Sequence, residues 1–293
     1  MVHAVESVTL AVAEPAAALR FFRDQLGWRV LYDARASVGL LSAWHYPVHE
    51  AVRLIELARD SSPTGRIRLA LYEDAPQRWA ASSGSTTART ALRTGPVAID
   101  LRAAAEPQGP LANSVVHPLA DGSALAILGR TSPAARAHSG GGDGFAAVWL
   151  LTADGPRAAH FYQDVLGYGT VSSGETSAAD APELGARLGL GAGRVRLSVL
   201  RAPGASVGGV ALLELTDSPE AQPGSTMRPG APGINLITCQ CDALDEVLQR
   251  LCSFGIEPDG APLHVGLPDG RRGRVLTVRG PSRELIELVE DTD

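Results

Sequence analysis

The sequence contains no lysine, and all 26 of its basic residues are arginines. A Schiff-base enzyme needs a lysine amine, and a Walker-type phosphate loop needs a lysine beside the phosphates, so both classes are excluded. Clustered positive charge is also missing, because the arginines are scattered and the formal net charge is −6. A nucleic-acid-binding surface needs such clustering. We therefore expect no nucleic-acid partner.

Long apolar runs and cysteines are scarce as well. No stretch approaches the roughly 18 apolar residues of a membrane-spanning helix, and the N-terminus lacks the pattern of a secretory signal. The three cysteines are Cys239, Cys241 and Cys252. An odd count without a secretory signal favours free thiols in a reducing compartment. We expect a cytoplasmic protein that does not associate with membranes.

What the sequence does contain is a long internal repeat. FFRDQLGW at residues 21–28 returns as FYQDVLGY at residues 161–168, and the match extends back to Ser7 and Ala147 without a gap. A repeat of this length indicates two homologous domains. We place them at residues 1–130 and 145–293, joined by a glycine-rich linker over residues 131–144.

Each half consists of two units in which a strand and a helix precede further strands. Alternation of apolar residues predicts the strands, and the helices of the first and third units should end at Gly27 and Gly167. The helices are expected at 16–26, 156–166 and 244–254, while the second unit is too broken for a full helix. The strands are expected at 5–12, 28–33, 51–58, 66–73, 97–103, 114–118, 123–128, 145–151, 168–173, 194–201, 209–216, 234–241, 262–266, 273–279 and 284–290. The predicted fold class is α+β, with four βαβββ units paired in chain order into two half-open-barrel domains.

This order of elements, with helices ending in F-[FY]-x-D-x-L-G-[WY], resembles the vicinal oxygen chelate superfamily. That superfamily is also named after glyoxalase, bleomycin-resistance proteins and extradiol dioxygenases. The resemblance implies sheets curled around a cleft. It also implies that metal enzymes of the superfamily hold one divalent metal in that cleft, with a His from the first strand of a unit and a Glu from the last.

The metal positions that the resemblance implies are mostly unsuited to a metal in this chain. The His position is occupied by Ser7, Ala98, Ala147 and Leu236. The acidic position is occupied by Glu287 and Glu214 in the fourth and third units, and by Leu71 and Ala126 in the first and second. Two carboxylates hold Mg²⁺ or Ca²⁺ only weakly and do not form an iron site of two His and one carboxylate. We expect no metal and no other cofactor, and hence neither glyoxalase I nor extradiol dioxygenase chemistry.

The candidate site residues lie in the predicted C-terminal cleft. Glu287 or Glu214 is the candidate general base, with His264 as a further catalytic candidate. Ionic pairing of the carboxylates with Arg196 or Arg274 is the structural alternative. Trp149 would stack on a flat ligand or simply fill the barrel. The other residues expected to line the substrate site are Thr238, Gln240, Leu236 and Ala147.

Three functions compete on this sequence. The first is a metal-independent lyase, isomerase or cyclase that acts on a hydrophobic, oxygenated small molecule, and the resemblance allows a place in natural-product biosynthesis. The second is a non-catalytic protein that sequesters a metabolite, as the bleomycin-resistance branch does. The third is a metal enzyme with displaced ligands, which would need His264 or His117 near Glu287. The carboxylates favour the enzyme, acting as a monomer or homodimer.

Overall fold

The computed structural model describes residues 1–59, 62–73, 95–101, 114–119, 124–129, 144–177, 185–186, 193–217 and 228–292. Every predicted strand is present, and the largest difference is in β9, which continues to Ser177. The strands are β1 (Val2–Ala11), β2 (Arg29–Arg35), β3 (Val52–Ala58), β4 (Arg66–Tyr72), β5 (Gly95–Asp100), β6 (Ser114–Leu119), β7 (Ala124–Gly129), β8 (Ala147–Thr152), β9 (Gly169–Ser177), β10 (Arg194–Arg201), β11 (Gly209–Leu215), β12 (Gly233–Cys241), β13 (Leu263–Gly266), β14 (Arg272–Arg279) and β15 (Leu285–Asp291).

The three predicted helices are confirmed, and the described residues also include a helix that was not predicted. The helices are α1 (Pro15–Leu19), which continues as the π-helical turn η1 (Arg20–Gln25); α5 (Gly155–His160), which continues as η5 (Phe161–Val165); α7 (Leu244–Ser253); and the unpredicted α2 (Val38–Ala43). Gly27 and Gly167 follow their helices with φ of 74° and 80°, the left-handed conformation that glycine adopts without strain. Within the described part of the chain, no helix is long and apolar enough to cross a membrane.

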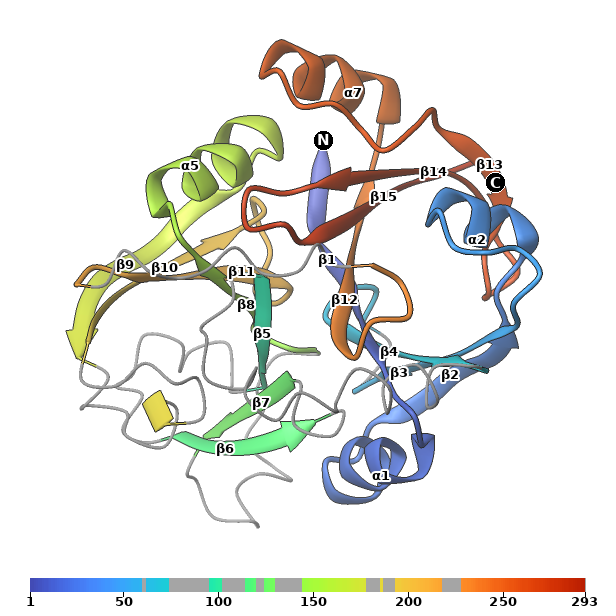
Figure 1. Ribbon diagram of the computed structural model, residues 1–293, viewed down its shortest axis with the longest axis horizontal. Coiled ribbons are helices and arrows are strands. Elements are labelled where there is room, and N and C mark those ends of the chain that lie inside the picture. Colours follow the sequence, from blue (N-terminus) through green and yellow to red (C-terminus); the bar gives the residue numbers. More distant parts are fainter. Residues whose placement is uncertain are drawn as a thin grey trace.

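Within each unit, the first strand runs parallel to the last strand and beside it. β1 pairs with β4, β5 with β7, β8 with β11, and β12 with β15. The units join into one sheet of order β13-β14-β15-β12-β1-β4-β3-β2 and another of order β6-β7-β5-β8-β11-β10-β9. Both sheets curl, and helices α1, α5 and α7 lie outside the curves (Figure 1).

The predicted pairing of units in chain order is wrong. β1 pairs antiparallel with β12, and β5 pairs antiparallel with β8, so the first unit shares a sheet with the fourth and the second with the third. In each unit, one edge of the first strand has unpaired backbone N–H and C=O groups. Any other unit can pair with that edge, whether or not the two units are neighbours in the chain. Residues 131–143 of the predicted linker lie outside the described residues, so the domain boundary stays a prediction.

Backbone hydrogen bonds join segments that flank the strands of the two sheets. The amide of Gly65 donates to Val5 O (3.0 Å), and Phe145 N donates to Gly65 O (2.9 Å). Gly208 N then donates to Phe145 O (2.9 Å), and Val5 N donates to Gly208 O (2.8 Å). A β-carbon on Gly65 would lie 2.9 Å from the backbone of Gly144, and its φ is 73°. Only glycine fits at residue 65, so the sequence there sets how the two sheets meet.

A buried carboxyl outside the clefts links η5 to the turn before β15. Tyr162 Oη donates to Glu284 Oε1 (2.8 Å), and burial raises the pKa of Glu284 to about 7. Since this folded-state pKa exceeds the unfolded value, the carboxyl stabilises the fold fully at low pH. Stability is lost as pH rises from about 4.5 to about 7, because the folded protein then holds a proton that the unfolded chain releases.

We therefore expect Glu284→Gln to flatten the pH dependence of stability. The decrease in the free energy of unfolding between pH 4.5 and pH 8 should be smaller by about 3 kcal/mol. This is the free energy that corresponds to the rise in the pKa of Glu284 from 4.5 to about 7. Urea denaturation of parent and variant at the two pH values measures the difference. If the two proteins lose stability in parallel over this range, Glu284 is not the titrating group.

Candidate functional site

The concave face of the eight-stranded sheet has an apolar end that is filled by α2. Leu40, Leu41 and Trp44 pack there against side chains from the sheet. The sheet side chains in this cluster are Ala11, Val52, Leu54, Ala70, Tyr72, Leu236, Val265, Val275, Leu285 and Val289. Cleft residues of both the first and the fourth unit thus lie under one helix, which closes this end of the cleft.

Helix α2 is fixed at both ends by polar contacts. Ser37 caps its N-terminus by accepting a hydrogen bond from Leu40 N (3.2 Å), and its Oγ donates to Gly266 O (2.8 Å). At the other end, Thr277 Oγ1 donates to Ala43 O (3.0 Å). Both partners, Gly266 and Thr277, belong to the fourth unit. The helix therefore ties the second half of the sheet to the insertion between β2 and β3.

Arg68 lies at the centre of the polar end of the concave face. It projects from β4 and is 6% exposed. Its Nη1 lies 3.3 Å from Glu287 Oε2 and 3.4 Å from Thr238 Oγ1. Its Nε lies 3.2 Å from Glu56 Oε2 and 3.0 Å from Tyr32 Oη. Burial alone would lower the pKa of Arg68, but Tyr32, Glu56 and Glu287 raise it above its usual value, so the guanidinium is charged.

Both oxygens of Glu287 are engaged. Oε1 accepts a hydrogen bond from Trp44 Nε1, and Oε2 accepts one from Thr238 Oγ1 (2.7 Å) as well as from Arg68. The residue is 1% exposed. A carboxylate with this many hydrogen-bond donors has little freedom to move. Glu287 is therefore fixed between the first unit, the fourth unit and the end of α2.

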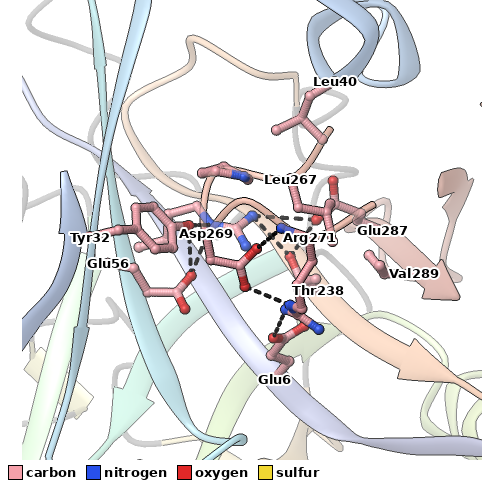
Figure 2. Close-up of a pocket in the computed structure, with 12 residues that line it drawn as sticks. Glu6, Tyr32, Leu40, Glu56, Thr238, Leu267, Asp269, Arg271, Glu287 and Val289 are labelled. Atoms are coloured by element: carbon pink, nitrogen blue, oxygen red, sulfur yellow. Dashed lines mark hydrogen bonds and ion pairs between the residues drawn. The ribbon is translucent and has the colours of Figure 1, made fainter. Parts of the chain in front are cut away.

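The ion pairs continue from Arg68 along the wall of the cleft with alternating charge. Glu56 Oε1 accepts from Arg66 Nη1 (3.0 Å), and Arg66 Nη1 lies 3.5 Å from Glu6 Oε1. Glu6 Oε1 in turn lies 3.3 Å from Arg271 Nη2. Figure 2 shows Glu6, Arg271 and Asp269 at this end of the series. The polar wall is thus one network from β15 to the β13–β14 turn.

Glu6 is the titratable carboxyl of this network. Burial raises its pKa to about 7, and the nearby Glu56 adds to the rise, while Arg68, Arg271 and Arg66 oppose it. Its side chain is 6% exposed. A carboxyl with this pKa is present in both protonation states near neutral pH. It can therefore either donate or accept a proton there.

A small cavity lies between the charged wall and α2. Its free space for a water-sized sphere is about 10 Å³, which suits one water molecule. Figure 2 shows the side chains around it converging from both units and from the β13–β14 turn. The lining residues are Glu6, Tyr32, Leu40, Glu56, Arg68, Thr238, Leu267, Pro268, Asp269, Arg271, Glu287 and Val289. The cavity thus has one charged side and one apolar side.

The structure places the predicted site residues of the fourth unit at different locations. Thr238 and Glu287 lie opposite each other on β12 and β15 and both line the cavity. Leu236 belongs to the apolar cluster under α2, and Gln240 is half-buried further along β12. His264 is exposed on the edge strand β13. The structure therefore does not bring His264 to the cleft.

The predicted association of Glu214 with Glu287 is wrong. Glu214 belongs to β11 of the seven-stranded sheet. It alternates in phase with Val210 and Leu212, which pack in the core under the helices, so it lies on the outer face. There it pairs with Arg196 (3.1 Å) and accepts from Gly155 N (2.9 Å) at the start of α5. The structural alternative of an edge carboxylate paired with Arg196 is what the structure shows.

Trp149 and Ala147 lie in the other sheet as well. Both are on β8, which pairs with β11 and β5. Trp149 is 1% exposed, and its Nε1 donates to Asp100 Oδ2 (3.3 Å). Its side chain is thus enclosed within this half-barrel. His117, the other candidate, stacks on Phe21 with ring centroids 4.2 Å apart and does not approach Glu287.

The site residues that the sequence interpretation missed include Glu6, Tyr32, Trp44, Glu56 and Arg68. One signal could have found two of them, Glu56 and Arg68, because charged residues stand inside the apolar strand sequences VRLIELA and RIRLALY. Such charges are buried only when they are paired. Glu6 escapes this rule because β1 is irregular in its pairing with β12 around Val5 and Ser7. Trp44 follows a helix of six residues, which is too short for a periodic pattern.

Comparison with solved structures identifies the architecture. Glyoxalase I from Zea mays superposes with a TM-score of 0.57 over 98% of this chain and 92% of its own, at 11% identity. A candidate dioxygenase from Bacillus subtilis subsp. subtilis str. 168 gives a TM-score of 0.55 over 100% and 86%, at 12% identity. The chain has the vicinal oxygen chelate fold. No family model and no curated protein matches the sequence.

The residues of this cleft do not fit the divalent metal that the resemblance implies for metal enzymes of the superfamily. The strand register pairs Thr9 with Arg68 in the first unit and Thr238 with Glu287 in the fourth. The counterpart of Glu287 is therefore Arg68, and the predicted assignment of Leu71 to that position is wrong, because Leu71 packs against the core on the outer face. A guanidinium bound to the acidic ligand opposes any divalent cation. In the described residues, no three His, Cys, Asp or Glu could hold a metal ion.

Proposed function

We propose that the cavity beside Glu6 binds a hydrophobic, oxygenated small molecule and that the protein is a metal-independent enzyme whose reaction begins with proton transfer at Glu6. The observation that carries the proposal is the buried Glu6 carboxyl with a pKa of about 7 on the cavity wall. A general base is most effective when its pKa is near the working pH. Glu6 takes the role that the sequence interpretation gave to Glu287, whose oxygens are both occupied.

The neighbours of Glu6 suit proton abstraction next to an oxygen function. Removing a proton from carbon beside a carbonyl places negative charge on that oxygen. Arg271, 3.3 Å from Glu6, and Arg68 on the same cavity supply fixed positive charge for it. Leu40, Leu267 and Val289 form an apolar wall opposite. Elimination, isomerisation and cyclisation all start from such a step, which corresponds to a lyase, isomerase or cyclase.

Substrate entry requires the cavity to widen, because its present volume suits a single water molecule. We propose that the cavity opens at the contact between α2 and β13. This contact consists of the hydrogen bond from Ser37 to Gly266 O and the packing of Gly39 against Val265. Separation of these two elements would open the cavity from the side of Leu40 and Leu267.

A non-catalytic sequestering protein is the second candidate. It is favoured by the enclosed form of the cleft, in which Trp44 and Arg68 hold Glu287. A protein that only retains its ligand gains from such enclosure. A metal-dependent reaction of the kind suggested by the names glyoxalase and dioxygenase is not proposed, because Arg68 stands at the ligand position.

Hydrogen–deuterium exchange into bound compounds distinguishes the two candidates. A panel of 2-oxo acids, hydroxyketones and cyclic enones is incubated with the protein in D₂O and followed by proton NMR. Line broadening identifies the compounds that bind. For these compounds, we expect the parent to accelerate exchange at the carbon next to the carbonyl. The exchange rate with Glu6→Gln should be lower by a factor of at least about 100.

Glu214→Gln is the matched control. Glu214 is a carboxylate of the other sheet, so this variant should accelerate hydrogen–deuterium exchange as much as the parent does. Equal rates in the parent and in Glu6→Gln would show that Glu6 is not the base. Binding of panel compounds without any exchange would favour sequestration.

A further inference from the structure

Arg68 and Glu287 occupy matched positions in two units that are related by a local two-fold axis. β1 and β12 are antiparallel, with Ser7 opposite Thr238 and Thr9 opposite Leu236. Arg68 lies beside Thr9 on β4, as Glu287 lies beside Thr238 on β15. The four side chains of Thr9, Arg68, Thr238 and Glu287 therefore surround the axis. Arg68 and Glu287 are the last-strand positions of the two units that share the sheet, and Thr9 and Thr238 each lie two residues beyond Ser7 and Leu236 on the first strands.

A single guanidinium makes the contacts that join these positions. Nη1 of Arg68 reaches both Glu287 Oε2 and Thr238 Oγ1, and Nε reaches Glu56 and Tyr32. Arg68 thus bridges the last strands of the two units, as one cation held by both would. The negative charges that surround it, Glu56 and Glu287, are buried and would be unfavourable without a cation.

Two polar groups at this place have no partner among the described residues. Nη2 of Arg68 donates to none of them, although the side chain is 8% exposed and lines the cavity. The hydroxyl of Thr9, in register with Arg68, is enclosed and also lacks a hydrogen-bond partner there. A buried hydroxyl without a partner, as in Thr9, is uncommon, and it indicates a place for a water molecule or for an oxygen of a ligand.

We propose that Arg68 is the cation of this cleft in place of a divalent metal, and that its Nη2 binds an anionic or carbonyl oxygen of the ligand. The guanidinium neutralises Glu287, which leaves no vacancy for a metal between the two units. It also directs its remaining N–H groups at the cavity, which a carboxylate or enolate oxygen would accept in a charge-assisted hydrogen bond. The ligand part of this inference rests on the proposed function, whereas the exchange of metal for arginine does not.

The test is to remove the guanidinium and rebuild a metal site around the same axis. Thr9→His/Arg68→Glu/Thr238→His supplies an imidazole from each first strand and a carboxylate from β4, with Glu287 already present on β15. Isothermal titration with Ni²⁺ should find one site per chain, bound at least about 100-fold more tightly than by the parent. Circular dichroism confirms that the variant is folded.

The matched control, Thr9→His/Thr238→His, keeps Arg68 and should bind Ni²⁺ no better than the parent. Equally tight binding by this control would overturn the inference, as would a folded triple variant that binds no better than the parent. If the triple variant does not fold, Arg68→His alone is used, and 1 mM Ni²⁺ should raise its melting temperature but not that of the parent. The same Ni²⁺ stabilisation in the parent, or none in either protein, would overturn the inference. No substrate enters this experiment, so its outcome is independent of the exchange assay on Glu6.

Discussion

Replacing Arg68 by Met should lower the free energy of unfolding by about 3–5 kcal/mol, the usual cost of leaving one partner of a buried ion pair without the other. Met fills most of the volume of the arginine stem, so the loss comes from Glu56 and Glu287 rather than from a cavity. Both carboxylates are almost fully buried, at 1% exposure each. Urea denaturation at pH 7 measures the change. The comparison uses the same dependence of the unfolding free energy on urea concentration for the parent and the variant.

The double variant Arg68→Met/Glu287→Leu is the control for this result. Apolar replacement of a whole buried pair is often close to neutral, so the double variant should recover a large part of the loss. Glu56 keeps Arg66 and Tyr32 as partners in both variants. If the double variant is less stable than the single one, or if the single variant costs less than about 1 kcal/mol, Arg68 does not neutralise Glu287.

Trp44→Ala should destabilise the protein by about 3–5 kcal/mol, as expected for truncating a buried aromatic side chain. Trp44 is 2% exposed, packs among the cleft residues under α2, and donates to Glu287. Its removal leaves a cavity and deprives Glu287 of one donor. Thermal or urea denaturation at pH 7 measures the loss.

Trp44→Phe is the matched control for the truncation. It keeps an aromatic ring under α2 but removes the indole N–H, so it should cost about 1–3 kcal/mol, the range for a buried acceptor that loses its partner. The difference between the two variants reports the packing of α2 in the hollow of the sheet. A loss below about 1 kcal/mol for Trp44→Ala would mean that α2 does not close the cleft.

The strands could be predicted almost completely from the sequence, and their pairing could not. Alternation of apolar and polar residues depends on each strand's own two faces, so it located β1 through β15 without any knowledge of neighbours. Pairing between β1 and β12 joins residues such as Val8 and Ile237, which no local pattern connects. The repeat shows that the units are alike, and likeness alone leaves every pairing of units open. This is why Trp149 and Glu287 were expected in one cleft and lie in two sheets.

Two site assignments failed for a simpler reason, the parity of residues along a strand. Glu214 has the phase of Val210 and Leu212, which are buried under the helices, so its outward position follows from alternation. Leu71 has the phase of Leu69 and Ile67 on β4, while Arg66 and Arg68 have the opposite phase and face the cleft. Counting along β4 from its most apolar residues would have placed Arg68, and not Leu71, on the cleft face. The position of α2 over the cleft has no such local signal.

Metal content is the measurement that tests the central claim most directly, since the claim is that a guanidinium holds the place of the metal. The protein is produced in medium supplemented with zinc, nickel, manganese and iron, purified without chelators, and examined by inductively coupled plasma mass spectrometry. Because Arg68 lies 3.3 Å from Glu287 Oε2, we predict far less than one equivalent of any divalent metal per chain. One equivalent of a divalent metal that is lost on Glu287→Gln substitution would contradict the account.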